Sequence, residues 1–153
     1  MTAKEYLQNI RDLHLDIIAK EKDLAELKQQ AESLQNTALT ERVQSSKSNS
    51  SNQTIDEVID IENLLNEKKT MCNKLIMSTY KIIIQISEEK YRRVLIEYYF
   101  NCRTWSGVSD VMHLNKRWVF RLHGRALQEF EKKLNWPPKS HYKATTDHDI
   151  IVS

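Results

Sequence analysis

The chain of 153 residues has a formal net charge of +2, and 40% of its residues are apolar while 29% are charged. Only two glycines and two prolines interrupt it, which predicts an all-α protein with helix over nearly its full length. No stretch approaches the roughly 18 consecutive apolar residues of a membrane span, so we expect no membrane partner. Cys72 and Cys102 are too far apart for a Cys-x-x-Cys site, and no signal-peptide pattern is present. We therefore expect reduced thiols and a cytoplasmic protein.

Two long heptad patterns occupy residues 1–87. Thr2 and Glu5 have the spacing of a capping box, and Thr54 and Glu57 repeat it before the second pattern. The apolar stripes that follow are Tyr6, Ile10, Leu13, Ile17, Leu24, Leu27, Ala31 and Leu34, and then Val58, Ile61, Leu65, Cys72, Leu75, Thr79, Ile82 and Ile86. Between them, residues 37–53 are dominated by Ser, Asn, Thr and Gln and predict a flexible linker loop.

Neither helix can bury so narrow a stripe alone. The linker is long enough to turn the second helix back on the first, which predicts an antiparallel, coiled-coil-like stalk over 1–87. The same stripes could instead pair between two chains, and heptad spacing does not separate the two arrangements. Both are compatible with a four-helix homodimer formed through the stalk.

Residues 88–134 predict a compact helix-turn-helix module. Ser87 opens one helix, Thr104 caps a short second helix, and Asn115 caps a last helix running to about Leu134. The break at His113 gives the second and last helices a three-residue connection, the spacing of a helix-turn-helix. The core residues expected from the helical phase are Trp105, Val108, Val119, Leu122, Ala126 and Leu127.

The same module carries ten basic against six acidic side chains, which favours a polyanionic partner. The start of the last helix presents outward the residues predicted for base readout in the DNA major groove, namely Lys116, Arg117, Phe120 and Arg121. Arg103 and Arg125 lie farther from the helix start and are predicted to meet phosphates. A solvated basic face is the competing interpretation, and the turn spacing favours contact with double-stranded DNA.

Two further residues of the last helix have open interpretations. Trp118 lies at the boundary between the inward and outward faces, so both a core and a reading role fit it. Gly124 costs about 1 kcal/mol relative to alanine in a helix interior. It marks either close approach to another helix or a chance substitution.

The segments Trp105–Met112, Asn115–Val119 and Arg121–Leu127 resemble the region-four helix-turn-helix of bacterial sigma factors. The whole chain, from its first residues through Glu41–Ser46, resembles a phage-encoded family of unknown function. That family is related to the RinA and ArpU late-gene regulators of phages that infect Gram-positive bacteria.

The resemblance implies a phage transcription regulator in the bacterial cytoplasm that activates late or packaging genes and contacts host RNA polymerase. The sigma-type reading positions fall on Lys116, Arg117, Phe120 and Arg121. Phe120 departs from the usual polar residue, so the sigma promoter element is not implied. The chain also lacks the region with which sigma factors melt promoters.

Other classes of protein fit the sequence less well. The five histidines form no His-x-x-x-His or His-Glu-x-x-His pattern, so we expect no enzyme, no metal and no cofactor. A coiled-coil assembly or adaptor protein, whose basic module docks on protein, is the main alternative to a DNA-binding regulator. Residues 135–153 begin with a Trp-Pro-Pro stop signal and predict a disordered tail.

Overall fold

The computed structural model describes residues 1–40 and 47–134, with side chains described for 1–37 and 52–134. Its elements are α1 (Ala3–Thr40), α2 (Lys47–Ile83), α3 (Glu89–Leu95), the π-helical turn η1 (Ile96–Phe100), α4 (Trp105–Met112) and α5 (Lys116–Leu134). No strand occurs among the described residues, and the predicted all-α class is confirmed. The predicted tail at 135–153 lies outside the described residues.

The chain forms two compact units. One comprises residues 9–77 and is called the hairpin unit here, and the other comprises residues 1–8 with those from 78 onward and is called the C-terminal unit. This division differs from the predicted boundary at residue 87. The reason lies in Tyr6, whose ring stacks on Phe130 with centroids 6.2 Å apart and whose hydroxyl lies 3.1 Å from Thr79 Oγ1. The start of α1 and the end of α2 therefore belong with the helix-turn-helix.

The ends of the two long helices only partly follow the predicted signals. The capping box at the start of α1 is confirmed, since Thr2 N donates to Glu5 Oε2 at 2.6 Å and Glu5 N to Thr2 Oγ1 at 3.2 Å. The second box is wrong, because α2 begins at Lys47 and Thr54 lies inside it. Within the predicted linker 37–53, the residues of α1 and α2 are helical. The segment Glu41–Ser46 lies outside the described residues.

Polar residues remain helical there because the stretch contains no glycine or proline. Serine and threonine cost only some tenths of a kcal/mol each in a helix. Their hydroxyls also find partners on the helix itself: Ser33 Oγ donates to the carbonyl of Gln29, and Thr37 Oγ1 to that of Ser33, each at 2.9 Å. Polar composition alone therefore does not end α1 at residue 36.

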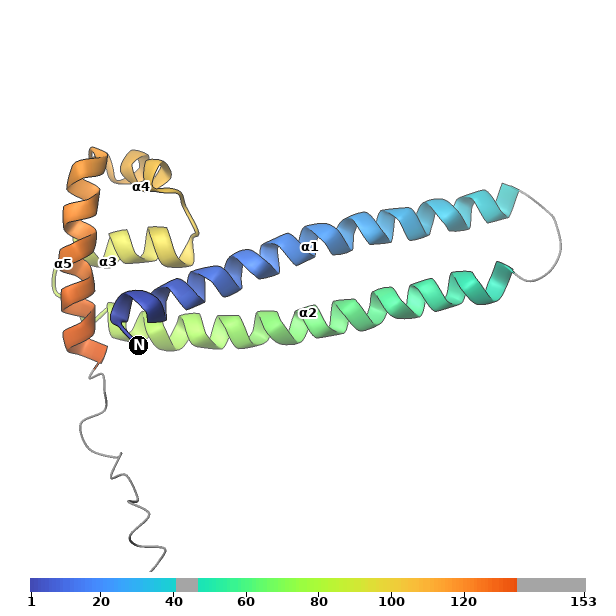
Figure 1. Ribbon diagram of the computed structural model, residues 1–153, viewed down its shortest axis with the longest axis horizontal. Coiled ribbons are helices and arrows are strands. Elements are labelled where there is room, and N and C mark those ends of the chain that lie inside the picture. The colour runs from blue at the N-terminus through green and yellow to red at the C-terminus, as the bar shows by residue number, and fades with distance from the viewer. Residues whose placement is uncertain (41–46, 135–153) are drawn as a thin grey trace, which may run out of the picture. The chain divides into compact units, whose positions relative to one another are not determined.

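The hairpin unit is an antiparallel pair of helices, as predicted (Figure 1). Its core consists of Ile17, Leu24, Leu65 and Cys72, with Leu13, Val58 and Ile76 packed against them. Lys28 pairs with Glu62 at 2.8 Å and Lys69 with Glu21, so residue numbers rise along one helix as they fall along the other. These ion pairs are solvent-exposed and contribute at most about 1 kcal/mol each. Apolar packing therefore holds the hairpin together.

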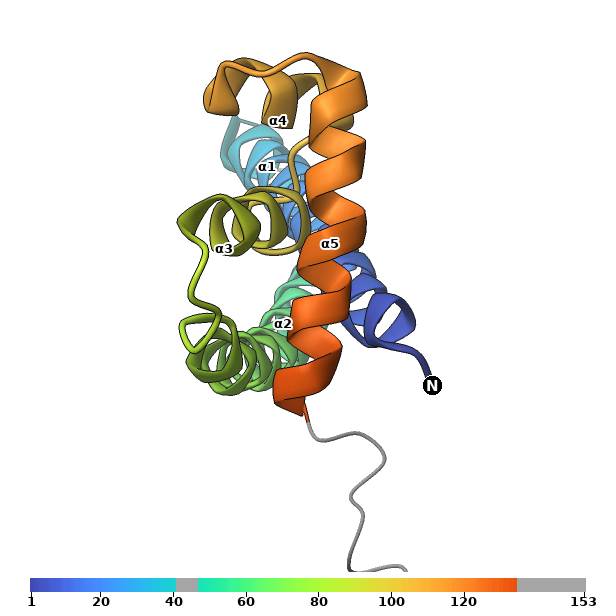
Figure 2. The same ribbon diagram turned by 90° about the vertical axis from the view of Figure 1, so that its left-hand side faces the viewer.

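In the C-terminal unit, α5 packs against both α3 and α4 (Figure 2). The helix α3 begins after Glu88 rather than at the predicted Ser87. It passes directly into η1, where the amide of Asn101 donates to the carbonyl of Ile96, five residues earlier, at 2.9 Å. The wider turn places both Tyr99 and Phe100 in the core. Cys102 then leaves the helix with a positive φ of 53°.

Candidate nucleic-acid interface

The short helix α4 has well-defined ends. Thr104 is its N-cap, as predicted, and its Oγ1 accepts a hydrogen bond from Gly107 N at 3.1 Å. At the other end, His113 adopts the left-handed conformation with φ 54° and ψ 40°. Ser109 Oγ donates to the carbonyl of Leu114, and the Leu114 amide donates to the carbonyl of Ser109 at 3.1 Å. These bonds fix the direction in which the chain leaves α4.

Asn115 starts α5 as its predicted N-cap, since its Oδ1 accepts a hydrogen bond from Trp118 N at 3.0 Å. Three residues, His113 to Asn115, thus separate α4 from α5, and the two helices pack on each other. A capped helix, a three-residue turn and a second capped helix have the connection of a helix-turn-helix. In that motif, the second helix is the one whose amino-terminal part reaches base edges.

One face of α5 is buried in the C-terminal unit. Its buried side chains are Val119, His123, Ala126 and Phe130, which recur at intervals of three and four residues. Of the predicted core residues, Val108, Val119 and Ala126 are fully buried, and Trp105, Leu122 and Leu127 are partly buried. The predicted inward face of the motif is therefore correct. The buried face also includes His123, which the prediction omits, and Leu122 lies at its edge.

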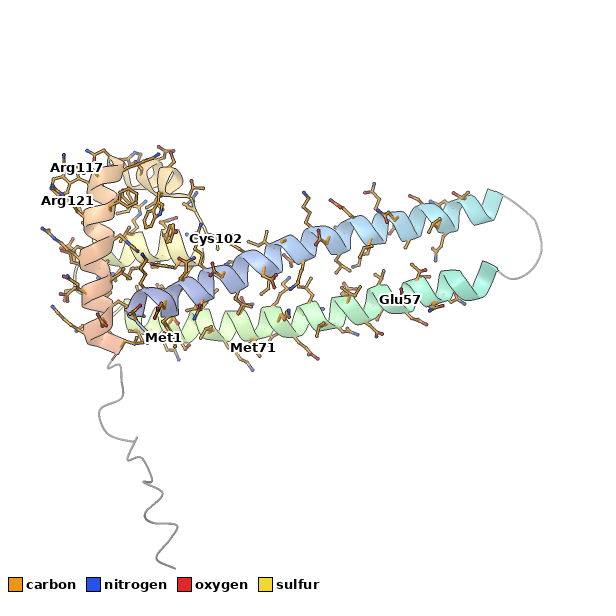
Figure 3. All side chains as sticks on the ribbon, viewed as in Figure 1. Met1, Glu57, Met71, Cys102, Arg117 and Arg121 are labelled. Atoms are coloured by element: carbon orange, nitrogen blue, oxygen red, sulfur yellow. The ribbon has the colours of Figure 1, made fainter. Side chains whose placement is uncertain are left out.

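All four residues predicted for base readout, Lys116, Arg117, Phe120 and Arg121, are exposed. At 3.6 residues per turn, Arg117 and Arg121 lie opposite the buried face, Phe120 lies on its flank, and Lys116 lies at the helix start. Figure 3 shows Arg117 and Arg121 on the amino-terminal half of the helix. The first turn of α5 contains no acidic residue, so no carboxylate on this turn offsets the positive charge. The amino-terminal half of α5 therefore exposes positive charges and an aromatic ring to solvent.

An aromatic stack supports Phe120 from beneath. Trp105 lies flat on Tyr98, with ring centroids 3.8 Å apart and planes 14° apart. Phe120 packs on the same indole at 5.1 Å and still leaves 49% of its surface exposed. The contact holds one side of the Phe120 ring in place while the other side stays open to a ligand. Trp105 therefore acts as the floor of the exposed surface as well as part of the core.

Trp118 also lies on the exposed surface, with 49% of its area accessible. The guanidinium carbon of Arg121 sits 5.4 Å from the centre of the Trp118 ring, within the range of a cation–π contact. The sequence did not decide whether Trp118 faces inward or outward, and it did not predict the contact with Arg121. The signal that could have found it is the i, i+3 spacing, which places the two side chains one above the other on a helix.

His123 is a buried polar residue that the predicted core omits. Its Nε2 lies 2.8 Å from the hydroxyl of Tyr99, and Trp105 meets its ring edge-on at 4.8 Å. Burial, reinforced by the positive charge of Lys4, lowers the pKa of His123 to about 4. The imidazole is therefore neutral at physiological pH. Its position four residues after Val119, on the inward face, was the available signal.

The two arginines predicted to contact phosphates differ in their surroundings. Arg125 is exposed on α5, whereas Arg103 Nε donates to Glu97 Oε2 at 2.5 Å. Burial would raise the pKa of Glu97, but hydrogen bonds from Asn101 and Arg103 and the arginine charge outweigh it and lower the pKa. The ionised Glu97 neutralises Arg103 locally. Only Arg125 presents an uncompensated charge of the kind that the prediction requires.

Gly124 does not mark close helix packing. A Cβ placed on Gly124 would meet no described atom within 4 Å, and the residue is exposed. The interpretation of this glycine as a point of helix contact is therefore wrong for the C-terminal unit. Its outward position leaves it on the same side of α5 as the basic residues.

Other kinds of site find no support in the part of the chain that the structure describes. No three His, Cys, Asp or Glu side chains gather there as a metal-binding group. Within residues 1–40 and 47–134, no helix combines the length and apolar character needed to cross a bilayer. Comparisons of the chain with family models, with curated proteins and with solved structures found no match.

Proposed function

We propose that this protein is a DNA-binding transcriptional regulator that reads the major groove with the amino-terminal half of α5. The observation that carries the proposal is the division of α5 into two faces. Val119, Ala126 and Phe130 are buried, and a cationic surface with an exposed phenyl ring lies opposite. Arginine can donate two hydrogen bonds to guanine, and an aromatic edge suits the methyl group of thymine.

The residues divide into two roles in this proposal. Lys116, Arg117, Phe120 and Arg121 contact base edges, with Arg121 oriented by Trp118. Arg125 contacts the phosphate backbone and sets affinity rather than sequence preference. The resemblance to phage late-gene regulators extends the proposal to activation of late or packaging genes in the bacterial cytoplasm, with host RNA polymerase as a partner.

Salt-dependent binding to duplex DNA is the first test. Fluorescence anisotropy with a labelled duplex, chosen by selection from a random pool, gives the affinity at several salt concentrations. Each phosphate that the chain neutralises contributes roughly −0.9 to the slope of log affinity against log salt, so binding should weaken as the salt concentration rises. A slope near zero, or no binding at low salt, contradicts the proposal and favours the alternative of a protein-docking assembly factor.

The second test separates base readout from general charge. The variant Arg117→Ala/Arg121→Ala should lose preference for the selected duplex over a scrambled one and keep weak, salt-sensitive binding to both. The matched control is Lys132→Ala/Lys133→Ala, which removes the same charge from the far end of α5 and should keep the preference. Circular dichroism verifies that both variants stay helical. Retained preference in the arginine variant would place the reading surface elsewhere.

A further inference from the structure

The hairpin unit leaves a second stripe of α2, most of it apolar, largely exposed. On α2, Ile61, Leu64 and Met71 are 43%, 58% and 67% exposed, respectively. With Lys68 and the partly buried Leu75, they recur at alternating intervals of three and four residues. That spacing is the seam of a coiled coil. Met71 is labelled on α2 in Figure 3.

This second stripe is distinct from the seam that faces α1. The inner seam of α2 contains Val58, Leu65, Cys72 and Ile76. At 3.6 residues per turn, Leu64 and Met71 each lie about 100° around the helix from the inner-seam residue that follows them. One helix with two such seams is the pattern of a bundle with more than two helices.

The charges of α2 are divided about the middle of this stripe. Residues 52–67 contain five acidic side chains and no basic one, and residues 68–77 contain three lysines and no acidic residue. The partner helix α1 pairs with only part of these charges: Lys28 meets Glu62, and Asp16 and Glu21 meet Lys68 and Lys69, respectively. Among the ion pairs between described residues, none uses Asp60, Glu67 or Lys74.

We infer that the second stripe is covered by the α2 helix of a second copy of this chain, running antiparallel, with the two-fold axis near Glu67 and Lys68. In that register, Leu64 of each copy meets Met71 of the other. Asp60 of each copy lies near Lys74 of the other, because the two residues lie about equally far from that axis along the helix, on either side of it. A parallel pair would set Asp60 against Asp60 and Lys74 against Lys74, which is repulsive.

The assembly is a closed, isologous dimer, because the same surface serves both copies. It does not depend on DNA binding, since the stripe lies in the hairpin unit. If the DNA-binding proposal is also correct, each dimer carries two copies of α5, which matches a binding site made of two repeated half-sites.

Sedimentation equilibrium of the full chain tests the apolar contact. The natural chain should be a dimer at micromolar concentration, and both Leu64→Glu and Met71→Glu should be monomers. Ile59→Glu is the matched control, because Ile59 is 46% exposed on a different face of α2 and should leave the dimer intact. Far-UV circular dichroism should be unchanged in all three, since the substituted side chains are exposed. A monomeric natural chain, or dimers in both stripe variants, overturns the inference.

Charge exchange tests the antiparallel register. Asp60→Lys and Lys74→Asp should each weaken the dimer about tenfold, because each creates two like-charge pairs in place of two attractions. The double variant Asp60→Lys/Lys74→Asp restores opposite charges only if the copies run antiparallel, so its dissociation constant should return to the natural value. A double variant as weak as the single ones contradicts the antiparallel register. DNA binding, measured separately, does not enter either outcome.

Discussion

The hydroxyl of Tyr99 and Nε2 of His123 lie 2.8 Å apart inside the C-terminal unit, joining η1 to the buried face of α5. Both residues are buried, so the hydrogen bond satisfies two polar groups that would otherwise lose their contact with water. The pair lies behind the helix face that we propose to read DNA. Protonating His123 or breaking this hydrogen bond should therefore weaken the packing of α5 in the C-terminal unit.

The stability of the C-terminal unit should fall as the pH falls from about 6.5 toward 4. The folded state lowers the pKa of His123 from 6.5 to about 4, so the unfolded chain binds more protons in that window. The contribution of neutral His123 is present in full above pH 6.5 and is lost below it. We expect a loss on the order of 2–3 kcal/mol, seen as a difference between the natural chain and His123→Gln in urea unfolding. Parallel pH profiles for the two proteins would contradict this.

Removing the Tyr99 hydroxyl should destabilise the same unit at neutral pH. Tyr99→Phe keeps the ring but leaves the buried His123 nitrogen without its partner, which costs about 1–3 kcal/mol. Tyr80→Phe, at an exposed position, is the control and should change the free energy of unfolding by less than about 0.5 kcal/mol. Equal effects in the two variants would mean that the buried hydrogen bond contributes nothing measurable.

The sequence signals that succeeded are local and involve few competing choices. Thr2, Thr104 and Asn115 each combine a capping side chain with an apolar pattern directly after it, and all three caps form. The exposure of Arg117 and Arg121 followed from helical phase, because Val119, Ala126 and Phe130 on the other side of α5 are apolar.

The features that were missed depend on weak or non-local terms. The helix α2 begins at Lys47 because the helix propensities of several polar residues add up. No single capping motif marks this start in the sequence. The π-helical turn at Ile96–Phe100 inserts one extra residue per turn into a continuous helix. The spacing of its apolar residues is close to that of an α-helix, so the sequence alone does not distinguish the two. The burial of His123 requires its partner Tyr99, 24 residues earlier in the chain.

Replacing Gly124 by alanine should stabilise the protein. The position lies inside α5, and an added methyl group meets no described atom within 4 Å. Alanine favours a helix interior over glycine by about 1 kcal/mol, so the free energy of unfolding should rise by about that amount. Urea unfolding measures the change. A lower stability would show that a neighbour occupies the space in solution.

The two cysteines should differ sharply in reactivity. Cys72 is 2% exposed in the hairpin core, and burial raises the pKa of its thiol, whereas Cys102 is partly exposed. Because the thiolate is the reactive form, alkylation of Cys72 in the Cys102→Ser variant should be at least roughly tenfold slower than alkylation of Cys102 in Cys72→Ala. Denaturant should remove the difference. Equal rates in the folded proteins would mean that the hairpin core opens readily.

Arg103 and Arg125 should contribute unequally to DNA affinity, although the sequence assigned both to phosphates. Arg125→Ala should weaken binding to all duplexes alike and reduce the salt slope by about 0.9, the value for one phosphate contact. Arg103→Ala should change the slope less, because Glu97 already neutralises its charge at 2.5 Å. Glu97→Gln supplies the converse: it releases Arg103 and should strengthen binding at low salt. Equal slopes for the two alanine variants, with no gain in Glu97→Gln, would show that the ion pair opens when DNA binds.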